Sequence, residues 1–166
     1  MASRVPAASQ FAVYGPTFLD VVMGPLDGPP VPGREAWAEG ALMCAGGAAN
    51  QAIALARLGA SVCLHSRVGV DQMGVFVDEM LAREGVDTSS CERVGDQNVT
   101  VSLSFDGDRA MTTRGTTALP RLGGDASACL LADVRGISAN SEVVSSWRER
   151  GTWVLADTAW DEAGAW

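Results

Sequence analysis

Two adjacent glycines and an asparagine form the first group of residues that could bind a ligand. Gly46, Gly47 and Asn50 lie between a predicted strand and a predicted helix. Glycines at such a junction let the backbone approach a ligand closely, and the first turn of a helix offers free N–H groups. The Asn50 amide donates and accepts hydrogen bonds, which suits a ligand that carries hydroxyl groups. A tight turn with a capping asparagine explains the same residues without any ligand.

Asp20 is the second candidate, because it follows closely on a short apolar segment. Residues 11–14 predict a buried strand that stops at Gly15-Pro16. Ligands of open α/β sheets bind at the carboxyl ends of the strands, and a carboxylate there can accept hydrogen bonds from two sugar hydroxyls. An aspartate that caps a turn is the alternative interpretation.

The composition excludes several classes of enzyme. All twelve basic residues are arginine, and the chain contains no lysine. A Walker phosphate-binding loop, a protein kinase and a Schiff-base enzyme each need a lysine, so this chain can form none of them. The glycine pair also lacks the G-x-G-x-x-G spacing of a dinucleotide-binding loop.

The charge and the cysteines limit the partners. The net charge is −8 and the arginines do not cluster, so we expect no nucleic-acid partner. No apolar run reaches 18 residues, so we expect no membrane partner. The cysteines are far apart and His65, the single histidine, lies among apolar residues, so we expect no metal site and a core histidine. These features are typical of a cytoplasmic protein with reduced thiols.

The order of apolar segments predicts an α/β fold in which a parallel sheet is flanked by helices. We expect strands at 11–14, 61–68, 128–132 and 152–156. The helices are expected from Ala48 to Gly59, from the capping residue Asp71 to Gly85, and from Asn140 or Ser141 to Gly151.

A second, smaller sheet is predicted beside this body. The alternation of apolar and polar residues over 99–105, followed by Asp106-Gly107, indicates a β-hairpin that spans 99–113. Together with strands at about 17–24 and 36–44, this hairpin forms an antiparallel sheet. Residues 1–10 are expected to be a flexible leader, and 11–166 to belong to one domain.

These motifs together resemble the first signature region of the PfkB (ribokinase-like) carbohydrate kinases. After the glycine pair and Asn50 come Gln51-Ala52, the segment L-A-R-L-G-A at 55–60, and Gly69-Val70-Asp71 with Gly74. The resemblance extends from about residue 11 to residue 166.

The resemblance implies an ATP-dependent kinase that phosphorylates a hydroxyl group of a sugar or a nucleoside. It implies a ribokinase-like α/β body with a small antiparallel β lid, ATP and Mg²⁺ as cofactors, and a homodimer contact through the lid. By motif position, Asp20, Gly46, Gly47 and Asn50 would bind substrate hydroxyls. Asp157, after the last predicted strand, would face the substrate.

Two departures from the family pattern concern the substrate. Phe18 stands where ribokinases have an asparagine, and the segment A-G-G-A-A-N at 45–50 lacks the lysine of their G-G-K-G-A-N. Both differences argue against ribose itself. Arg114 or Arg135 could bind an acidic substrate instead.

A third departure concerns catalysis. The family's catalytic aspartate lies in a D-T-x-G-A-G-D motif, which residues 161–166 match only in part. We therefore expect no catalytic residue and no ATP-binding residues in this chain, which would be truncated before the ATP-binding half and inactive alone. A non-catalytic sugar-binding module, or a pseudokinase that associates through its lid, is the alternative.

Overall fold

The computed structural model describes residues 9–158, and its central element is a four-stranded parallel sheet. The strands are β1 (Phe11–Tyr14), β4 (Val62–His65), β9 (Cys129–Asp133) and β10 (Trp153–Asp157), in the order β10-β9-β1-β4. All three pairs are parallel, which confirms the predicted body sheet. The leader at 1–10 lies almost wholly outside the described residues, and so does the partial motif at 161–166.

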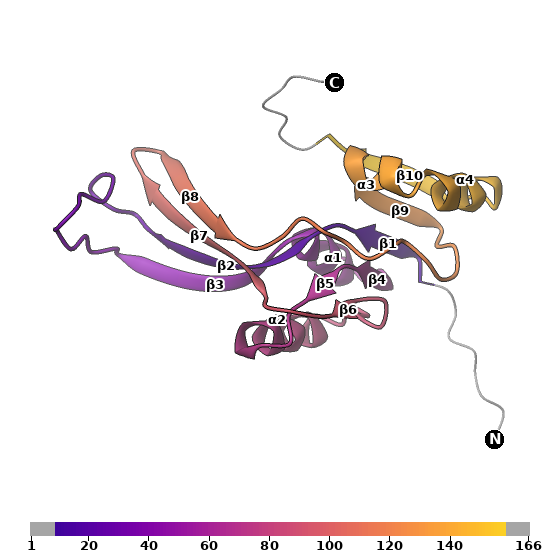
Figure 1. Ribbon diagram of the computed structural model, residues 1–166, viewed down its shortest axis with the longest axis horizontal. Coiled ribbons are helices and arrows are strands. Elements are labelled where there is room, and N and C mark those ends of the chain that lie inside the picture. The colour runs from indigo at the N-terminus through magenta and orange to yellow at the C-terminus, as the bar shows by residue number, and fades with distance from the viewer. Residues whose placement is uncertain (1–8, 159–166) are drawn as a thin grey trace.

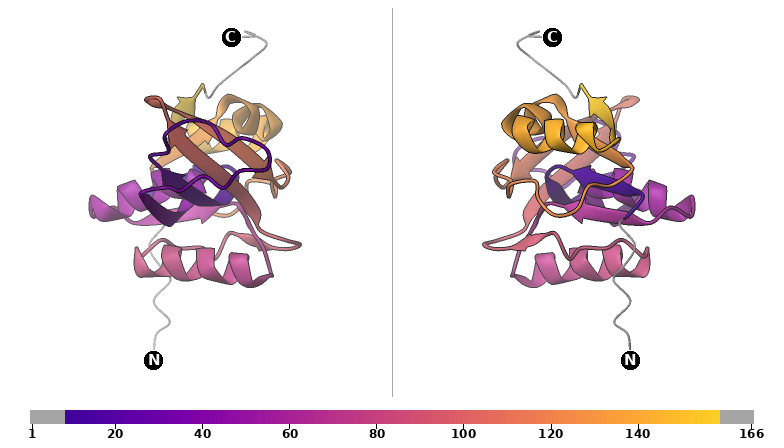
Figure 2. Two further views of the ribbon diagram at one scale, coloured as in Figure 1. Left: turned by 90° about the vertical axis from the view of Figure 1, so that its left-hand side faces the viewer. Right: turned by 90° about the vertical axis from the view of Figure 1, so that its right-hand side faces the viewer.

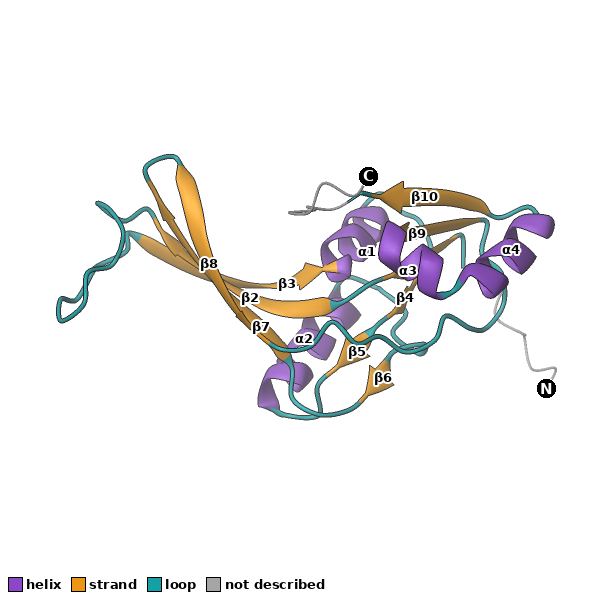
Figure 3. Ribbon diagram, turned by 45° about the horizontal axis from the view of Figure 1, so that its top comes forward, coloured by secondary structure: helices purple, strands orange, loops and turns teal. Residues whose placement is uncertain are grey.

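A second four-stranded sheet, the lid sheet, extends away from the body (Figure 1). It consists of β2 (Thr17–Gly24), β3 (Gly40–Gly47), β7 (Asn98–Phe105) and β8 (Asp108–Arg114), in the order β3-β2-β7-β8. The helices lie beside the body sheet, whereas the lid sheet reaches past them (Figure 3).

The lid sheet corrects two predictions. Its central pair, β2 and β7, is parallel and not antiparallel, because both strands start at the body and run outward. The strand predicted at 36–44 begins at Gly40 and continues to Gly47. Residues 36–39 lie outside the strand, since β2 ends at Gly24, which pairs with Gly40.

The strand predicted at 61–68 is divided at Ser66. Its first part is β4, and its second part, β5 (Arg67–Val68), leaves the body sheet and pairs in parallel with β6 (Glu92–Arg93). Ser66 is fully buried, and its hydroxyl donates a hydrogen bond of 2.6 Å to the carbonyl of Gly15. This bond ties the break in the strand to the turn after β1.

The first two helices begin and end where the local signals predicted. They are α1 (Ala48–Arg57) and α2 (Gln72–Arg83). The Asp71 carboxylate caps α2 by accepting a 2.9 Å hydrogen bond from the Gly74 N–H. Gly59 and Gly85 follow the two helices with φ of +88° and +74°, the left-handed conformation that ends a helix.

The last helical segment differs from the prediction. The helix α3 (Val134–Ala139) was not expected and is capped by Asp133, which accepts from the Gly136 N–H at 2.5 Å. The helix α4 (Ser141–Glu149) follows at once. Asn140 precedes α4 as predicted, but its side chain accepts from the Leu122 N–H at 2.9 Å and does not cap the helix.

Alternating side chains of the body sheet pack against helices on both of its faces. Val13 and Leu64 share one core with α1 and α2, and Ala12 and Tyr14 share the other with α4. Figure 2 shows α2 and α4 at opposite ends of this stack. In the described part of the chain, no helix is long and apolar enough to cross a membrane.

His65 lies in the interior, as predicted. The imidazole is buried and meets the Trp147 ring edge-on, with 6.2 Å between the ring centroids. Burial lowers the pKa of His65, and the negative charge of Asp87 opposes this effect. The neutral ring therefore serves the packing of α4 on the sheet.

The strand β10 forms an incompletely covered edge of the body sheet. The side chains of Trp153 and Leu155 are 77% and 53% exposed. β10 and α4 also border an open cavity of about 890 Å³, whose lining includes Val144, Trp153 and Val154. An edge strand with apolar side chains and unpaired backbone groups is a template for association.

We predict that this edge makes the chain self-associate. Trp153→Gln combined with Leu155→Gln should reduce concentration-dependent assembly in sedimentation velocity, because it removes exposed apolar surface without opening the core. Leu58→Gln is the control, since Leu58 is 84% exposed at the end of α1, away from the edge strand. Equal assembly by the parent and the double variant would contradict the prediction.

Candidate functional site

The junction between β3 and α1 passes very close to the turn that connects β1 with β2. Gly47, the residue before α1, has φ of +64°, and a Cβ atom here would overlap the carbonyl oxygen of Pro16. The next residue, Ala48, donates its N–H to that same oxygen at 2.9 Å. Only glycine fits this position without strain, because the clash is with backbone atoms.

Asp20 lies on β2, against the end of β3. A Cβ atom on Gly46 would overlap the Asp20 carboxylate, so the missing side chain of Gly46 provides the space that Asp20 occupies. Asp20 is half-buried. Burial raises the pKa of its carboxyl group, and a hydrogen bond from the Thr100 side chain opposes that rise.

A thiol lies on the other side of Asp20. Cys44 is paired with Asp20 across β2 and β3. The pKa of Cys44 is raised by burial and, to a smaller extent, by the negative charge of Asp20. All four cysteines of the chain are free.

The first turn of α1 reaches the end of β10. Asn50 is exposed in this turn. The amide of the next residue, Gln51, donates a hydrogen bond of 3.1 Å to the Asp157 carboxylate. Asp157 is the last residue of β10 and was predicted just after the strand. This bond places Asp157 beside the turn that carries Asn50.

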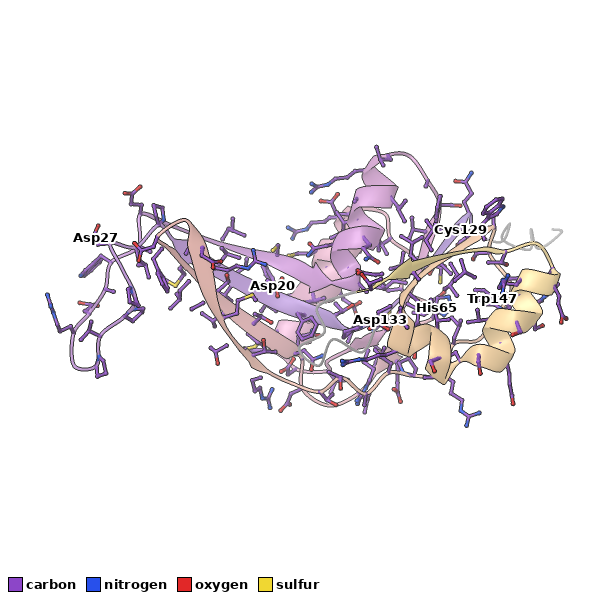
Figure 4. All side chains as sticks on the ribbon, turned by 90° about the horizontal axis from the view of Figure 1, so that it is seen from above. Asp20, Asp27, His65, Cys129, Asp133 and Trp147 are labelled. Atoms are coloured by element: carbon purple, nitrogen blue, oxygen red, sulfur yellow. The ribbon has the colours of Figure 1, made fainter. Side chains whose placement is uncertain are left out.

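Five of the six predicted site residues therefore lie along one edge. The strands β1, β4, β9 and β10 all end where the lid sheet begins. Figure 4 shows Asp20 between Asp133, at the end of β9, and Asp27, at the outer end of the lid sheet. Carboxylates, an amide and backbone N–H groups at such an edge can bind a ligand with several hydroxyl groups.

The structure does not bring Arg114 to this group. Thr113 shares a hydrogen bond with Thr100, on the lid face that carries Asp20, so the side chain of Arg114 lies on the opposite face. Its guanidinium forms an ion pair with Asp96, which raises the pKa of Arg114. The other arginine considered for an acidic ligand, Arg135, is exposed on α3.

The buried polar residues that anchor the lid sheet were not predicted from the sequence. Gln97 is almost completely buried and donates a hydrogen bond of 3.0 Å to the carbonyl of Thr17, the first residue of β2. Asn98 accepts from the Thr116 N–H at 2.8 Å and donates to the Thr116 carbonyl at 3.0 Å. The signal for this anchor in the sequence was the polar pair Gln97-Asn98, directly before the alternating segment 99–105.

Among residues 9–158, no three histidine, cysteine, aspartate or glutamate side chains come together in a way that could hold a metal ion. We assign no residue of this chain to the metal.

Comparison with known sequences connects this arrangement to carbohydrate kinases. Residues 38–128 match the pfkB family of carbohydrate kinases. A 2-dehydro-3-deoxygluconokinase from Bacillus subtilis (strain 168) is 46% identical over 56 residues, which are 34% of this chain and 17% of that protein.

Comparison with solved structures shows the same fold. A candidate ribokinase from Agrobacterium tumefaciens matches with a TM-score of 0.78 at 20% identity, over 91% of this chain and 53% of that one. A ribokinase from Arabidopsis thaliana, complexed with ribose and ATP, matches with a TM-score of 0.71 at 22% identity, over 92% and 54%. A nucleoside kinase from Methanocaldococcus jannaschii matches with a TM-score of 0.70 at 16% identity, over 92% and 54%. The chain spans about half the length of these solved structures.

We predict that alanine at the two neighbouring glycines has different effects. Gly47→Ala should destabilise the fold by about 1–3 kcal/mol, because a left-handed φ and a backbone clash cannot be relieved. Gly46→Ala should unfold at nearly the parent temperature, because the flexible Asp20 side chain can move away. Thermal unfolding followed by circular dichroism measures both effects.

The control for this pair is Gly28→Ala, since a Cβ atom on Gly28 meets nothing within 4 Å. A Gly47→Ala variant as stable as this control would contradict the proposed constraint at the junction.

Proposed function

Since the chain belongs to the pfkB family of carbohydrate kinases, we propose that it forms the substrate-binding and lid part of a kinase. The reaction is the ATP-dependent phosphorylation of a hydroxyl group of a sugar or a nucleoside. The solved relatives are about twice as long as this chain, so the activity is proposed for the protein that contains it.

The position of Asp20 carries this proposal. An ionised carboxylate accepts two or more hydrogen bonds, so it can bind neighbouring hydroxyl groups of a sugar. The Asp20 carboxylate occupies the space that a side chain at Gly46 would fill. Asn50 supplies a hydrogen-bond donor and an acceptor at the start of α1. Asp157 completes the proposed set through its bond to the same turn.

The described residues bind and orient the substrate in this proposal, and they do not carry out the transfer. Phosphoryl transfer depends on positioning and on stabilising the charge of the transferred group. The catalytic aspartate and the ATP-binding glycines are expected outside residues 9–158. ATP and Mg²⁺ are therefore proposed for the whole kinase, and no step is assigned to them here.

We propose a small sugar or sugar acid as the first substrate class to test. The relative from Bacillus subtilis is named a 2-dehydro-3-deoxygluconokinase, which makes 2-dehydro-3-deoxy-D-gluconate the first probe. D-Fructose and adenosine represent the neutral sugars and the nucleosides. The alternative function, a sugar-binding module without turnover, shares the binding step and lacks the transfer.

A homodimer through the lid sheet is the proposed assembly. Leu42 and Met111 are 56% and 59% exposed on the face that carries Asp20, one row further from the body. Covering these side chains with the lid of a second copy would remove apolar surface from water. A pseudokinase that associates in this way remains the alternative to an active kinase.

We predict that Asp20→Asn weakens binding of the sugar probe at least about tenfold, because hydrogen bonds to a charged group contribute about 1.5–3 kcal/mol each. The substitution should not destabilise the fold. A raised carboxyl pKa means that ionisation lowers stability as pH rises through the folded-state pKa, so the variant should unfold at the parent temperature or above it at pH 7.

Isothermal calorimetry and thermal unfolding measure the two effects. The matched control is Asp27→Asn, at the far end of the lid sheet (Figure 4). Equal affinity of the Asp20→Asn variant and the parent would overturn the role of Asp20. A parent chain that binds none of the three probes would favour the pseudokinase alternative.

We also predict that Leu42→Gln combined with Met111→Gln converts a dimer into a monomer when both are introduced into the Trp153→Gln and Leu155→Gln variant, in which the edge contact is removed. The measurement is the molar mass by light scattering at a fixed chain concentration. Met43→Gln is the control, because Met43 is 55% exposed but lies on the opposite lid face. A dimer mass that only the control variant reduces would place the contact on that other face.

A further inference from the structure

One row of side chains crosses the whole lid sheet on the face that carries Asp20. The strand register pairs Cys44 with Asp20, Asp20 with Thr100, and Thr100 with Thr113. Residues paired across neighbouring strands project to the same side of a sheet. Each of the four lid strands thus contributes one polar or ionisable side chain, and we call these four residues the lid row.

A hydrogen bond connects two members of the lid row on one side of Asp20. The hydroxyl oxygens of Thr100 and Thr113 lie 3.1 Å apart. Thr100 is the neighbour of Asp20 across β2 and β7, and its hydroxyl lowers the pKa of the Asp20 carboxyl group. A hydroxyl has one proton to donate, and an ionised carboxylate only accepts. A hydrogen bond from Thr100 to an ionised Asp20 therefore requires that Thr113 donates to Thr100.

The rows on either side of the lid row hold fewer polar side chains than the lid row does. The next row outward places Leu42, Val22 and Met111 around Ser102. The next row inward holds Gly46, Phe18 and Asn98, and the Asn98 amide is bonded to the backbone of Thr116. Thr100 is therefore the hydroxyl that the strand register places directly beside Asp20.

This inference rests on the proposed sugar site and names the residues that prepare it. We propose that Thr100 and Thr113 are positioning residues, which fix the orientation of the Asp20 carboxylate and keep it ionised for substrate hydroxyls. Thr100 occupies one acceptor direction of the carboxylate and leaves the others open to the ligand. Thr113 acts through Thr100: when Thr113 donates its proton to the Thr100 oxygen, the Thr100 proton is left to be donated to Asp20.

If Thr100 keeps Asp20 ionised, the pKa of Asp20 depends on the Thr100 hydroxyl, whereas a packing role for Thr100 would leave that pKa unchanged. Burial raises the pKa of Asp20 and the Thr100 hydroxyl lowers it. Removing that hydroxyl leaves burial unopposed, so the pKa of Asp20 rises further. Binding that requires the ionised carboxylate is then lost at a higher pH as the solution is acidified.

The first experiment measures this ionisation directly in the 166-residue chain. The ¹³C resonance of the Asp20 carboxyl carbon is followed against pH in the parent and in four variants. Thr100→Val should raise the pKa of Asp20, Thr100→Ser should restore the parent value, and Thr113→Val should raise the pKa by less. Thr112→Val is the matched control, because Thr112 is the neighbouring threonine on the opposite lid face, and it should change nothing.

The second experiment measures affinity for 2-dehydro-3-deoxy-D-gluconate against pH. Thr100→Val should weaken binding about tenfold, the equivalent of one hydrogen bond to a charged group. The acid limb of its binding curve should move to higher pH. Thr100→Ser should bind like the parent.

The two experiments separate this inference from the proposed function. A Thr100→Val variant with the parent pKa at Asp20 would overturn the positioning role, whether or not the sugar binds. The expected change in pKa, together with a parent that binds no sugar, would support the lid row and count against the sugar site. A folded Thr100→Val variant that binds as tightly as the parent at every pH would overturn the inference.

Discussion

The geometry of the site depends on a buried polar contact between the lid sheet and the body sheet. Ser66, at the break between β4 and β5, donates to the Gly15 carbonyl and shares a hydrogen bond of 2.9 Å with the Thr17 hydroxyl. Gln97 donates to the Thr17 carbonyl and accepts from the Gly69 N–H at 2.9 Å. Buried polar groups are costly unless each finds its partner, so these groups specify one arrangement of the two sheets.

The close approach at the glycine pair follows from this arrangement. With β2 held at Thr17, the turn before it presents the Pro16 carbonyl to the chain that enters α1. The space left there admits Gly47 and no side chain, and one residue earlier Gly46 leaves its space to Asp20. Both glycines therefore act through their missing side chains. Gly47 allows α1 to start beside the Pro16 carbonyl, and Gly46 allows the Asp20 carboxylate to lie over the backbone of β3.

Local signals in the sequence predicted much of the fold. The capping residue Asp71 and the glycines that end α1 and α2 act within a few residues, so the pattern around them was sufficient. The short helix α3 was missed because its start depends on Asp133, which also ends a strand. The parallel pairing of β2 with β7 joins segments about 80 residues apart, and no local pattern specifies such a pairing.

Arg114 shows why the site was harder to predict than the elements. The expected hairpin ended at Thr113, and the strand continues for one more residue. Side chains alternate between the faces of a strand, so one position decides whether a residue belongs to the site or to the opposite face. Thr113 was not predicted as a site residue, although the register places it in line with Asp20. Residue type can suggest chemistry, but register decides which side chains can act together.

The ionised form of Asp20 fits the proposed ligand-binding role better than a purely structural role. A carboxyl group whose pKa is raised by burial lowers the stability of the folded state once the pH exceeds that pKa. A purely structural polar contact with Thr100 could be made by an uncharged amide, which would avoid this loss. The threonine chain acts in the opposite direction, since it stabilises the charged form that burial disfavours. A charge kept in a place that folding alone does not favour agrees with the role proposed for Asp20, in which its carboxylate accepts hydrogen bonds from ligand hydroxyl groups.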